Sequence, residues 1–189
     1  KKEFDKNGVI ERFKVQLDRS KIKDTSNVLS PDFSWAIDSN FEINAQKYIF
    51  LAPFSSPKSK YKVWPHFKGL IDTLSKRLPE YELITAPGPN EIGLCKNMKL
   101  KMVLFNNKPI NICQLSKVIK QSSFVVANDT GPAHIAAHLG CRGVALFGHH
   151  TSARKVSIET KNFKIIERKH LENITQDQVA KFVIDKIST

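Results

Sequence analysis

The chain has 189 residues and a net charge of +12, with 41% hydrophobic and 25% charged residues, so it can form a folded core and is not a wholly disordered chain. No apolar run is long enough to cross a bilayer. The three cysteines, Cys95, Cys113 and Cys141, are too far apart to indicate a disulfide framework or a zinc site, and they favour a reducing compartment.

The positive charge arises from 30 Lys and Arg residues against 18 Asp and Glu residues. Such a balance attracts phosphates, acidic lipids or nucleic acid. The basic residues are scattered in small groups and form no single run, which is typical of a lysine-rich solvated surface. The charge pattern therefore argues against a dedicated nucleic-acid-binding arm.

The first quarter of the chain differs from the rest. Residues 3–17 have apolar side chains at a loose helical spacing, which predicts a helix. Gly8 counts against this prediction, because glycine has a low helix propensity. Residues 18–46 are polar and contain several helix breakers, which predicts a linker. Because the chain begins with Lys1, we expect residues 1–46 to connect a preceding, absent domain to the domain at 47–189.

From residue 47 onward, apolar runs alternate with amphipathic segments. The runs predict strands at 47–54, 81–87, 100–105, 123–129, 142–148 and 164–169. The segments between and after them predict helices at 67–78, 90–98, 112–122, 131–140 and 175–188, the last with Thr175 as N-cap and Gln178 in the capping-box position. Such alternation indicates an α/β fold, a Rossmann-like parallel sheet with helices on both faces. Ligands of such sheets bind at the carboxyl ends of the strands.

The first candidate site follows the strand at 123–129. Gly131 permits close approach of a ligand, and Pro132 suits the first turn of the next helix. The helix N-terminus and the Thr130 hydroxyl would bind a diphosphate, while Asp129 would accept hydrogen bonds from sugar hydroxyls. An equally good interpretation is that Asp129 or Thr130 merely caps the helix.

The second candidate site follows the strand at 47–54. Ser55 and Ser56 precede a group of lysines that ends in Lys62, and small hydroxyl residues with a lysine can bind phosphate. Solvent exposure is the ordinary explanation for any single lysine. Lys60 is an alternative to Lys62 because the register of this loop is open.

Two further groups of polar residues give weaker signals. Glu91, after the strand at 81–87, could accept the hydroxyls of a ribose, although a turn or a helix cap also explains it. His134 and His138 are one helical turn apart, and His149 and His150 follow the fifth strand. Without an HExxH glutamate or a cysteine ligand, we predict no metal site and hydrogen-bonding roles for these histidines.

Two segments together resemble a known family. FVVANDTGPAHIAAHLGCRGVALFGHHTS (124–152) resembles the donor-site signature of glycosyltransferase family nine, the ADP-heptose:lipopolysaccharide heptosyltransferase family. LAPFSSPKSKYKVWP (51–65) resembles its upstream block, in which hydroxyl residues precede Lys-x-Trp-Pro. The likeness covers residues 47–188 and, more weakly, 31–35. One departure is that many members have Gly-Pro-Thr where this chain has Gly-His-His-Thr at 148–151.

This resemblance implies the C-terminal, donor-binding half of a GT-B glycosyltransferase. By motif position, Ser55 and Ser56 correspond to hydroxyl residues near the diphosphate, Lys62 to the lysine that contacts phosphate, and Glu91 to an acidic residue on the ribose.

The remaining correspondences lie in the first candidate site. Asp129, Thr130 and Gly131 correspond to the tripeptide that binds sugar and diphosphate, and His134 to the histidine that follows it.

The resemblance also implies an activity and its partners. The expected reaction is inverting, metal-independent sugar transfer from a nucleotide-sugar, which in this family is usually ADP-heptose. The expected acceptor is a lipopolysaccharide core or related glycan, and no cofactor is expected. The general base is expected in the absent N-terminal half, so this chain alone would bind donor without turnover. The expected location is the cytoplasm, with peripheral contact at the inner membrane. Two alternatives stay open: a non-catalytic nucleotide- or phosphate-binding Rossmann-like domain, and a basic nucleic-acid-binding domain.

Overall fold

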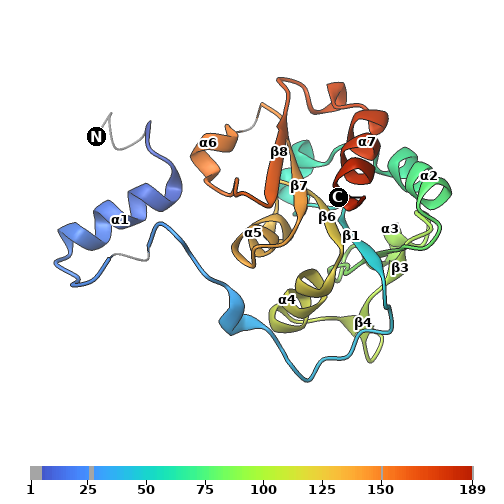
Figure 1. Ribbon diagram of the computed structural model, residues 1–189, viewed down its shortest axis with the longest axis horizontal. Coiled ribbons are helices and arrows are strands. Elements are labelled where there is room, and N and C mark those ends of the chain that lie inside the picture. Colours follow the sequence, from blue (N-terminus) through green and yellow to red (C-terminus); the bar gives the residue numbers. More distant parts are fainter. Residues whose placement is uncertain (1–5, 26–27, 150, 189) are drawn as a thin grey trace.

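The computed structural model of the chain describes residues 6–25, 28–149 and 151–188. A six-stranded parallel sheet with the order β3-β2-β1-β6-β7-β8 forms its centre (Figure 1). Its strands are β1 (Tyr48–Ala52), β2 (Glu82–Thr85), β3 (Lys101–Met102), β6 (Phe124–Asn128), β7 (Gly143–Phe147) and β8 (Phe163–Glu167). The predicted Rossmann-like sheet is confirmed, and its order reverses between β1 and β6.

Side chains on the central strands alternate between two apolar layers, because successive residues of a strand face opposite sides of the sheet. Ile49 and Leu51 of β1 join the core formed with helices α2 (Phe67–Arg77) and α7 (Gln176–Ile187). Tyr48 and Phe50 face the other core, formed with α4 (Ile112–Gln121) and α5 (Gly131–His138). Both faces are therefore covered, which explains why the central strands are almost entirely apolar.

The described residues before β1 form one helix and an irregular segment that packs against the core formed with α4 and α5. Helix α1 (Val9–Arg19) begins after Gly8, whose backbone N–H donates to the Glu11 carboxylate at 3.1 Å. Of the helix predicted at 3–17, residues 3–5 lie outside the described residues, and residues 6–8 precede the observed helix. A 3₁₀ turn at Ser34–Ala36 follows, and backbone hydrogen bonds tie this segment to α5 and α4, from Phe33 N–H to the His138 carbonyl and from Asp38 N–H to the Cys113 carbonyl.

The prediction of one strand at 100–105 is wrong in its second half. The chain leaves the sheet after β3, and β4 (Leu104–Phe105) pairs antiparallel with β5 (Lys108–Pro109). Asn106 and Asn107 connect them with φ values of 49° and 61°. Two consecutive residues with positive φ are typical of a tight hairpin turn, and Asn tolerates this conformation better than most residues.

Several helix boundaries also differ from those predicted. The helix predicted at 90–98 is the single turn α3 (Ile92–Cys95), and a short helix α6 (Ala153–Val156) was not predicted. Thr175 is the N-cap of α7 and accepts the Gln178 backbone N–H at 3.2 Å, as predicted. No helix in the described ranges is both long enough and apolar enough to span a membrane.

Candidate functional site

The two motifs singled out in the sequence lie side by side. Strands β1 and β6 are parallel neighbours, with Ala52 beside Ala127 at their carboxyl ends. The chain after β1 forms a 3₁₀ segment at Pro57–Lys62, kinked at Ser59, and the chain after β6 enters α5. Both loops therefore meet at the point where the strand order reverses, the usual ligand position in an open α/β sheet.

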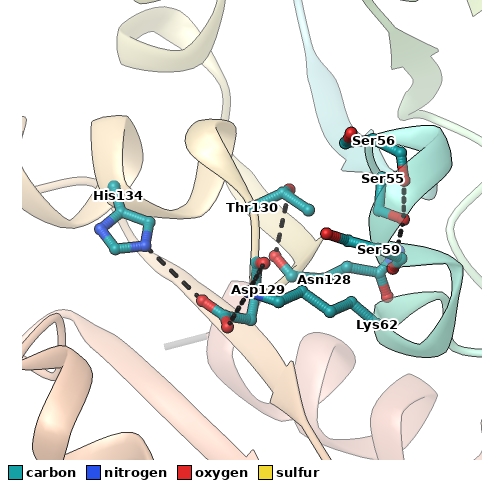
Figure 2. Close-up of polar contacts among 8 residues, drawn as sticks. All are labelled: Ser55, Ser56, Ser59, Lys62, Asn128, Asp129, Thr130 and His134. Atoms are coloured by element: carbon teal, nitrogen blue, oxygen red, sulfur yellow. Dashed lines mark hydrogen bonds and ion pairs between the residues drawn. The ribbon is translucent and has the colours of Figure 1, made fainter. Parts of the chain in front are cut away.

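The centre of the site is a group of three polar side chains, Lys62, Asp129 and His134 (Figure 2). Lys62 Nζ lies 2.7 Å from Asp129 Oδ2, and His134 Nε2 lies 3.6 Å from Asp129 Oδ1. Asp129 is only 3% exposed, so its charge requires a partner, while Lys62 remains 24% exposed and His134 41% exposed. The carboxylate is thus held inside the protein, with the two basic groups between it and solvent. Lys60 is exposed, which favours Lys62 over Lys60 as the lysine of this site.

Lys62 is positioned by the residue two places after it. Trp64 is 1% exposed, and its indole N–H donates to the Ile174 carbonyl at 2.7 Å. Its backbone N–H donates to Asn128 Oδ1 at 3.0 Å. Trp64 therefore joins the loop after β1 to the end of β6 and to the segment before α7. This anchoring holds Lys62 opposite Asp129.

The N-terminus of α5 completes one side of the site. Thr130 is its N-cap in extended conformation, but its side chain makes no capping hydrogen bond within the helix; the hydroxyl donates weakly to the Asn128 carbonyl at 3.3 Å. Thr130 is thus the N-cap, as one interpretation predicted, but it caps the helix without a side-chain hydrogen bond. Gly131 is exposed, and a Cβ built there meets nothing within 4 Å. The first turn of the helix is open to a ligand.

The two serines differ in their availability. Ser55 Oγ donates to the Ser59 carbonyl at 2.8 Å, and this bond holds the turn that leads to Lys62. Ser56 is exposed and is the N-cap of the 3₁₀ segment without a side-chain capping bond. Ser56 therefore has the more accessible hydroxyl, and Ser55 has a clear role in shaping the loop (Figure 2).

Glu91 lies after β2, the strand on the other side of β1. Its Oε2 accepts the Gly88 backbone N–H at 2.7 Å, which stabilises the turn before α3. The structure therefore gives Glu91 the turn-forming role that the sequence left open, and does not join it to the Lys62–Asp129 group by a hydrogen bond.

The remaining histidines lie near this edge or on α5. Burial lowers the pKa of His138, and the neighbouring His134 lowers it further. His149 packs its ring against His170 with 6.5 Å between ring centroids. His150 lies outside the described residues. Across residues 6–25, 28–149 and 151–188, no group of three or more His, Cys, Asp or Glu side chains is arranged to hold a metal ion.

Sequence reasoning missed the supporting role of Asn128 and Trp64. Asn128 is fully buried, and its Nδ2 is a buried donor without a partner among the described residues. Its position was visible as a polar residue that ends an apolar strand and precedes Asp129. The bond from Trp64 to it could not be seen because 64 residues separate the two.

A family of known proteins matches almost the entire chain. The profile of glycosyltransferase family 9 (heptosyltransferase) matches residues 2–182. No curated protein sequence is significantly similar.

Solved structures share the fold. The heptosyltransferase WaaC of E. coli with ADP is 20% identical, with a TM-score of 0.69, and the match covers 82% of this chain and 49% of that one. The E. coli ADP-heptose lps heptosyltransferase II is 18% identical, with a TM-score of 0.63 and coverage of 82% and 50%. A putative UDP-N-acetylglucosamine 2-epimerase from Listeria monocytogenes is 14% identical, with a TM-score of 0.60 and coverage of 95% and 50%. The chain thus spans about half the length of these proteins.

Proposed function

This chain belongs to glycosyltransferase family 9, the heptosyltransferase family, and from that membership we propose that it is the donor-binding half of a sugar transferase. The proposed ligand is a nucleoside diphosphate sugar, with ADP-heptose as the first candidate. Residues 1–46 are assigned to the connection with the other half, and residues 47–189 to the donor-binding domain. The observation that carries the proposal is the Lys62–Asp129 ion pair beside the N-terminus of α5.

A diphosphate suits this position for electrostatic reasons. The helix N-terminus carries partial positive charge, and its first N–H groups lack partners within the helix. Lys62 adds a full positive charge, partly open to solvent. When the donor binds, Lys62 would share its charge between Asp129 and the phosphates. Ser56 and Thr130 would add hydroxyl donors.

The sugar would lie next to Asp129 and His134. A carboxylate that accepts hydrogen bonds from sugar hydroxyls must remain ionised, and the two adjacent basic groups favour its ionised form. His134 is the second basic group within reach of Asp129 and would keep it paired when Lys62 moves toward phosphate. The same pair of loops would therefore recognise both parts of the donor.

The proposed reaction is inverting transfer to a hydroxyl of a lipopolysaccharide core or related acceptor. The acceptor oxygen forms a bond to the anomeric carbon as the bond to the diphosphate breaks, and the nucleoside diphosphate leaves with the bonding electrons. Lys62, Thr130 and the N-terminus of α5 would stabilise that leaving charge. The general base, which takes the acceptor proton, is assigned to the other half of the protein. We also propose that transfer needs no metal, and that it takes place in the cytoplasm with peripheral contact at the inner membrane.

Calorimetric titration with ADP, ADP-heptose, UDP-sugars and GDP-sugars tests this proposal and identifies which nucleotide base the donor carries. We expect saturable binding of one nucleotide class by the wild-type chain. Asp129→Asn should weaken binding of the nucleotide-sugar more than binding of the nucleoside diphosphate alone, because the sugar hydroxyls lose their charged hydrogen-bond acceptor.

The titration also separates the proposal from its alternatives. A folded chain that binds nucleotide diphosphates equally with and without sugar, and is insensitive to Asp129→Asn, would indicate a nucleotide- or phosphate-binding domain without donor recognition. A chain that binds none of these ligands at low salt would contradict the proposal.

A further inference from the structure

A second basic site lies at the opposite end of the sheet. A cavity of about 220 Å³ crosses the amino ends of β6, β7 and β8. Two aromatic rings, Phe124 and Phe182, line one part of it in an edge contact with 6.3 Å between centroids. Four positively charged residues also line it, together with Gly143 and Asn162: Arg142, Lys161, Lys164 and Lys186. A five-residue strand separates this end from the Lys62–Asp129 end by roughly 13 Å.

The cations converge from separate parts of the chain. Arg142 directly precedes β7, Lys161 lies in the turn before β8, and Lys164 is the second residue of β8. Thr160 fixes that turn, because its Oγ1 accepts the Phe163 backbone N–H at 2.9 Å. Two separate segments, the residue before β7 and the start of β8, thus place their charges around one cavity, which a solvated lysine-rich surface would not require.

Three of the four cations have no carboxylate partner among the described residues. Arg142, Lys161 and Lys164 form no ion pair with a carboxylate in the described part of the chain. Lys186 has a separate explanation, since it lies in the last turn of α7, where a helix favours positive charge. Like charges around a small cavity repel one another unless an anion lies between them.

We propose that this cavity binds a phosphate group, and that it is a site separate from the donor site. Arg can bind a phosphate with two parallel hydrogen bonds, and each lysine adds a point charge. The volume is below the range of about 300–1,000 Å³ typical of pockets for whole small-molecule ligands. It therefore suits one phosphate or pyrophosphate, either free or as the headgroup phosphate of a lipid whose remainder lies outside.

The test is titration of the ¹⁵N-labelled chain with inorganic pyrophosphate, followed by two-dimensional NMR. Amides of Arg142, Gly143 and residues 161–164 report on this cavity, and those of residues 129–131 report separately on the donor site. We expect saturable shifts in the first group. In the variant Arg142→Gln/Lys161→Gln/Lys164→Gln, the pyrophosphate affinity fitted from these shifts should fall at least tenfold. Any shifts at the donor site should stay as in wild type.

A control variant removes the same charge elsewhere. Lys68→Gln/Lys76→Gln/Lys96→Gln changes three exposed lysines outside the cavity. The control should bind pyrophosphate at the cavity within twofold of wild type. Equal weakening in both variants would show that only net charge matters and would overturn the proposal. Shifts confined to residues 129–131 would overturn it as well, without affecting the proposed donor site.

Vesicles identify the source of the phosphate. Co-sedimentation of the chain is compared for two kinds of vesicle. One is neutral phosphatidylcholine, and the other contains about 30% phosphatidylglycerol to give the surface the negative charge of an anionic membrane. Binding to anionic vesicles that the cavity variant loses and the control keeps supports a lipid headgroup. Cavity shifts with pyrophosphate, together with equal vesicle binding by both variants, support a free phosphate.

Discussion

Lys62 Nζ lies 2.7 Å from Asp129 Oδ2 and joins two loops that are 67 residues apart in the chain. The relationship is asymmetric, because Asp129 is 3% exposed and Lys62 is 24% exposed. The buried carboxylate of Asp129 therefore needs its ion-pair partner, whereas the ammonium group of Lys62 can also be solvated by water. The pair therefore contributes to stability as well as to the proposed ligand binding.

Replacing Lys62 with Ala should destabilise the fold, because Asp129 would keep a buried charge with a weaker partner. Losing one member of a buried pair costs about 3–5 kcal/mol, and the partial exposure of Lys62 reduces the expected loss to about 1–3 kcal/mol. The measurement is the free energy of unfolding in urea.

Two variants control this experiment. Lys60→Ala, two residues away and exposed, should change the free energy of unfolding by less than about 0.5 kcal/mol. Asp129→Asn should lower the free energy of unfolding by less than Lys62→Ala does, because it removes the buried charge itself. If Lys60→Ala and Lys62→Ala were equally stable, the ion pair would not have the structural role described.

Trp64→Phe should destabilise the chain by about 2 kcal/mol, because the buried Ile174 carbonyl loses its indole donor and the smaller ring leaves space. Trp35→Phe is the matched control, since Trp35 is 77% exposed, and should cost less than about 0.5 kcal/mol. Urea unfolding of both variants checks the difference. Similar losses for both would be inconsistent with Trp64 as the anchor of the site.

The cysteines should differ in reactivity. Burial raises the pKa of Cys95 and Cys141 to about 11, so both thiols stay protonated at pH 8, and Cys113 is the more accessible thiol. Iodoacetamide at pH 8 should therefore modify Cys113 first, as measured by peptide mass spectrometry. Rapid modification of Cys141 in the folded chain would show that the core around α5 opens more readily than its burial implies.

His138 should make stability fall as the pH falls below 6.5. Burial lowers its pKa in the folded chain, so below pH 6.5 the unfolded chain binds a proton that the folded chain excludes. The His138→Gln variant should lose less stability than wild type between pH 7.5 and pH 5.5. Unfolding in urea at both pH values gives the comparison, and an identical loss in the two chains would assign the effect to other groups.

The sequence predicted the sheet well because its strands are buried on both faces. Their apolar runs, such as the one that became β6, need no long-range information to be recognised. The hairpin at β4 and β5 escaped prediction because Leu104 and Phe105 continue an apolar run and only Asn106 and Asn107 mark the turn. A two-residue strand leaves no periodicity to detect.

The sequence located the two motifs on their separate loops, but it did not show how these loops meet. The strand ends that carry Lys62 and Asp129 were identified separately, but their contact depends on the neighbouring positions of β1 and β6. The functions of Ser55 and Glu91 in shaping their own turns were equally hidden, because a hydroxyl or carboxylate has the same sequence signal whether it binds backbone or ligand. Only the fold distinguishes these cases.

The most direct test of the donor-site account is the dissociation constant of ADP for wild type, Lys62→Ala and Lys60→Ala, measured side by side at one salt concentration. The account predicts that Lys62→Ala weakens binding about tenfold or more while Lys60→Ala stays within about twofold, because a charge-assisted bond to phosphate contributes about 1.5–3 kcal/mol. Equal affinities for the three folded chains would contradict the assignment of the diphosphate to the Lys62–Asp129 edge of the sheet.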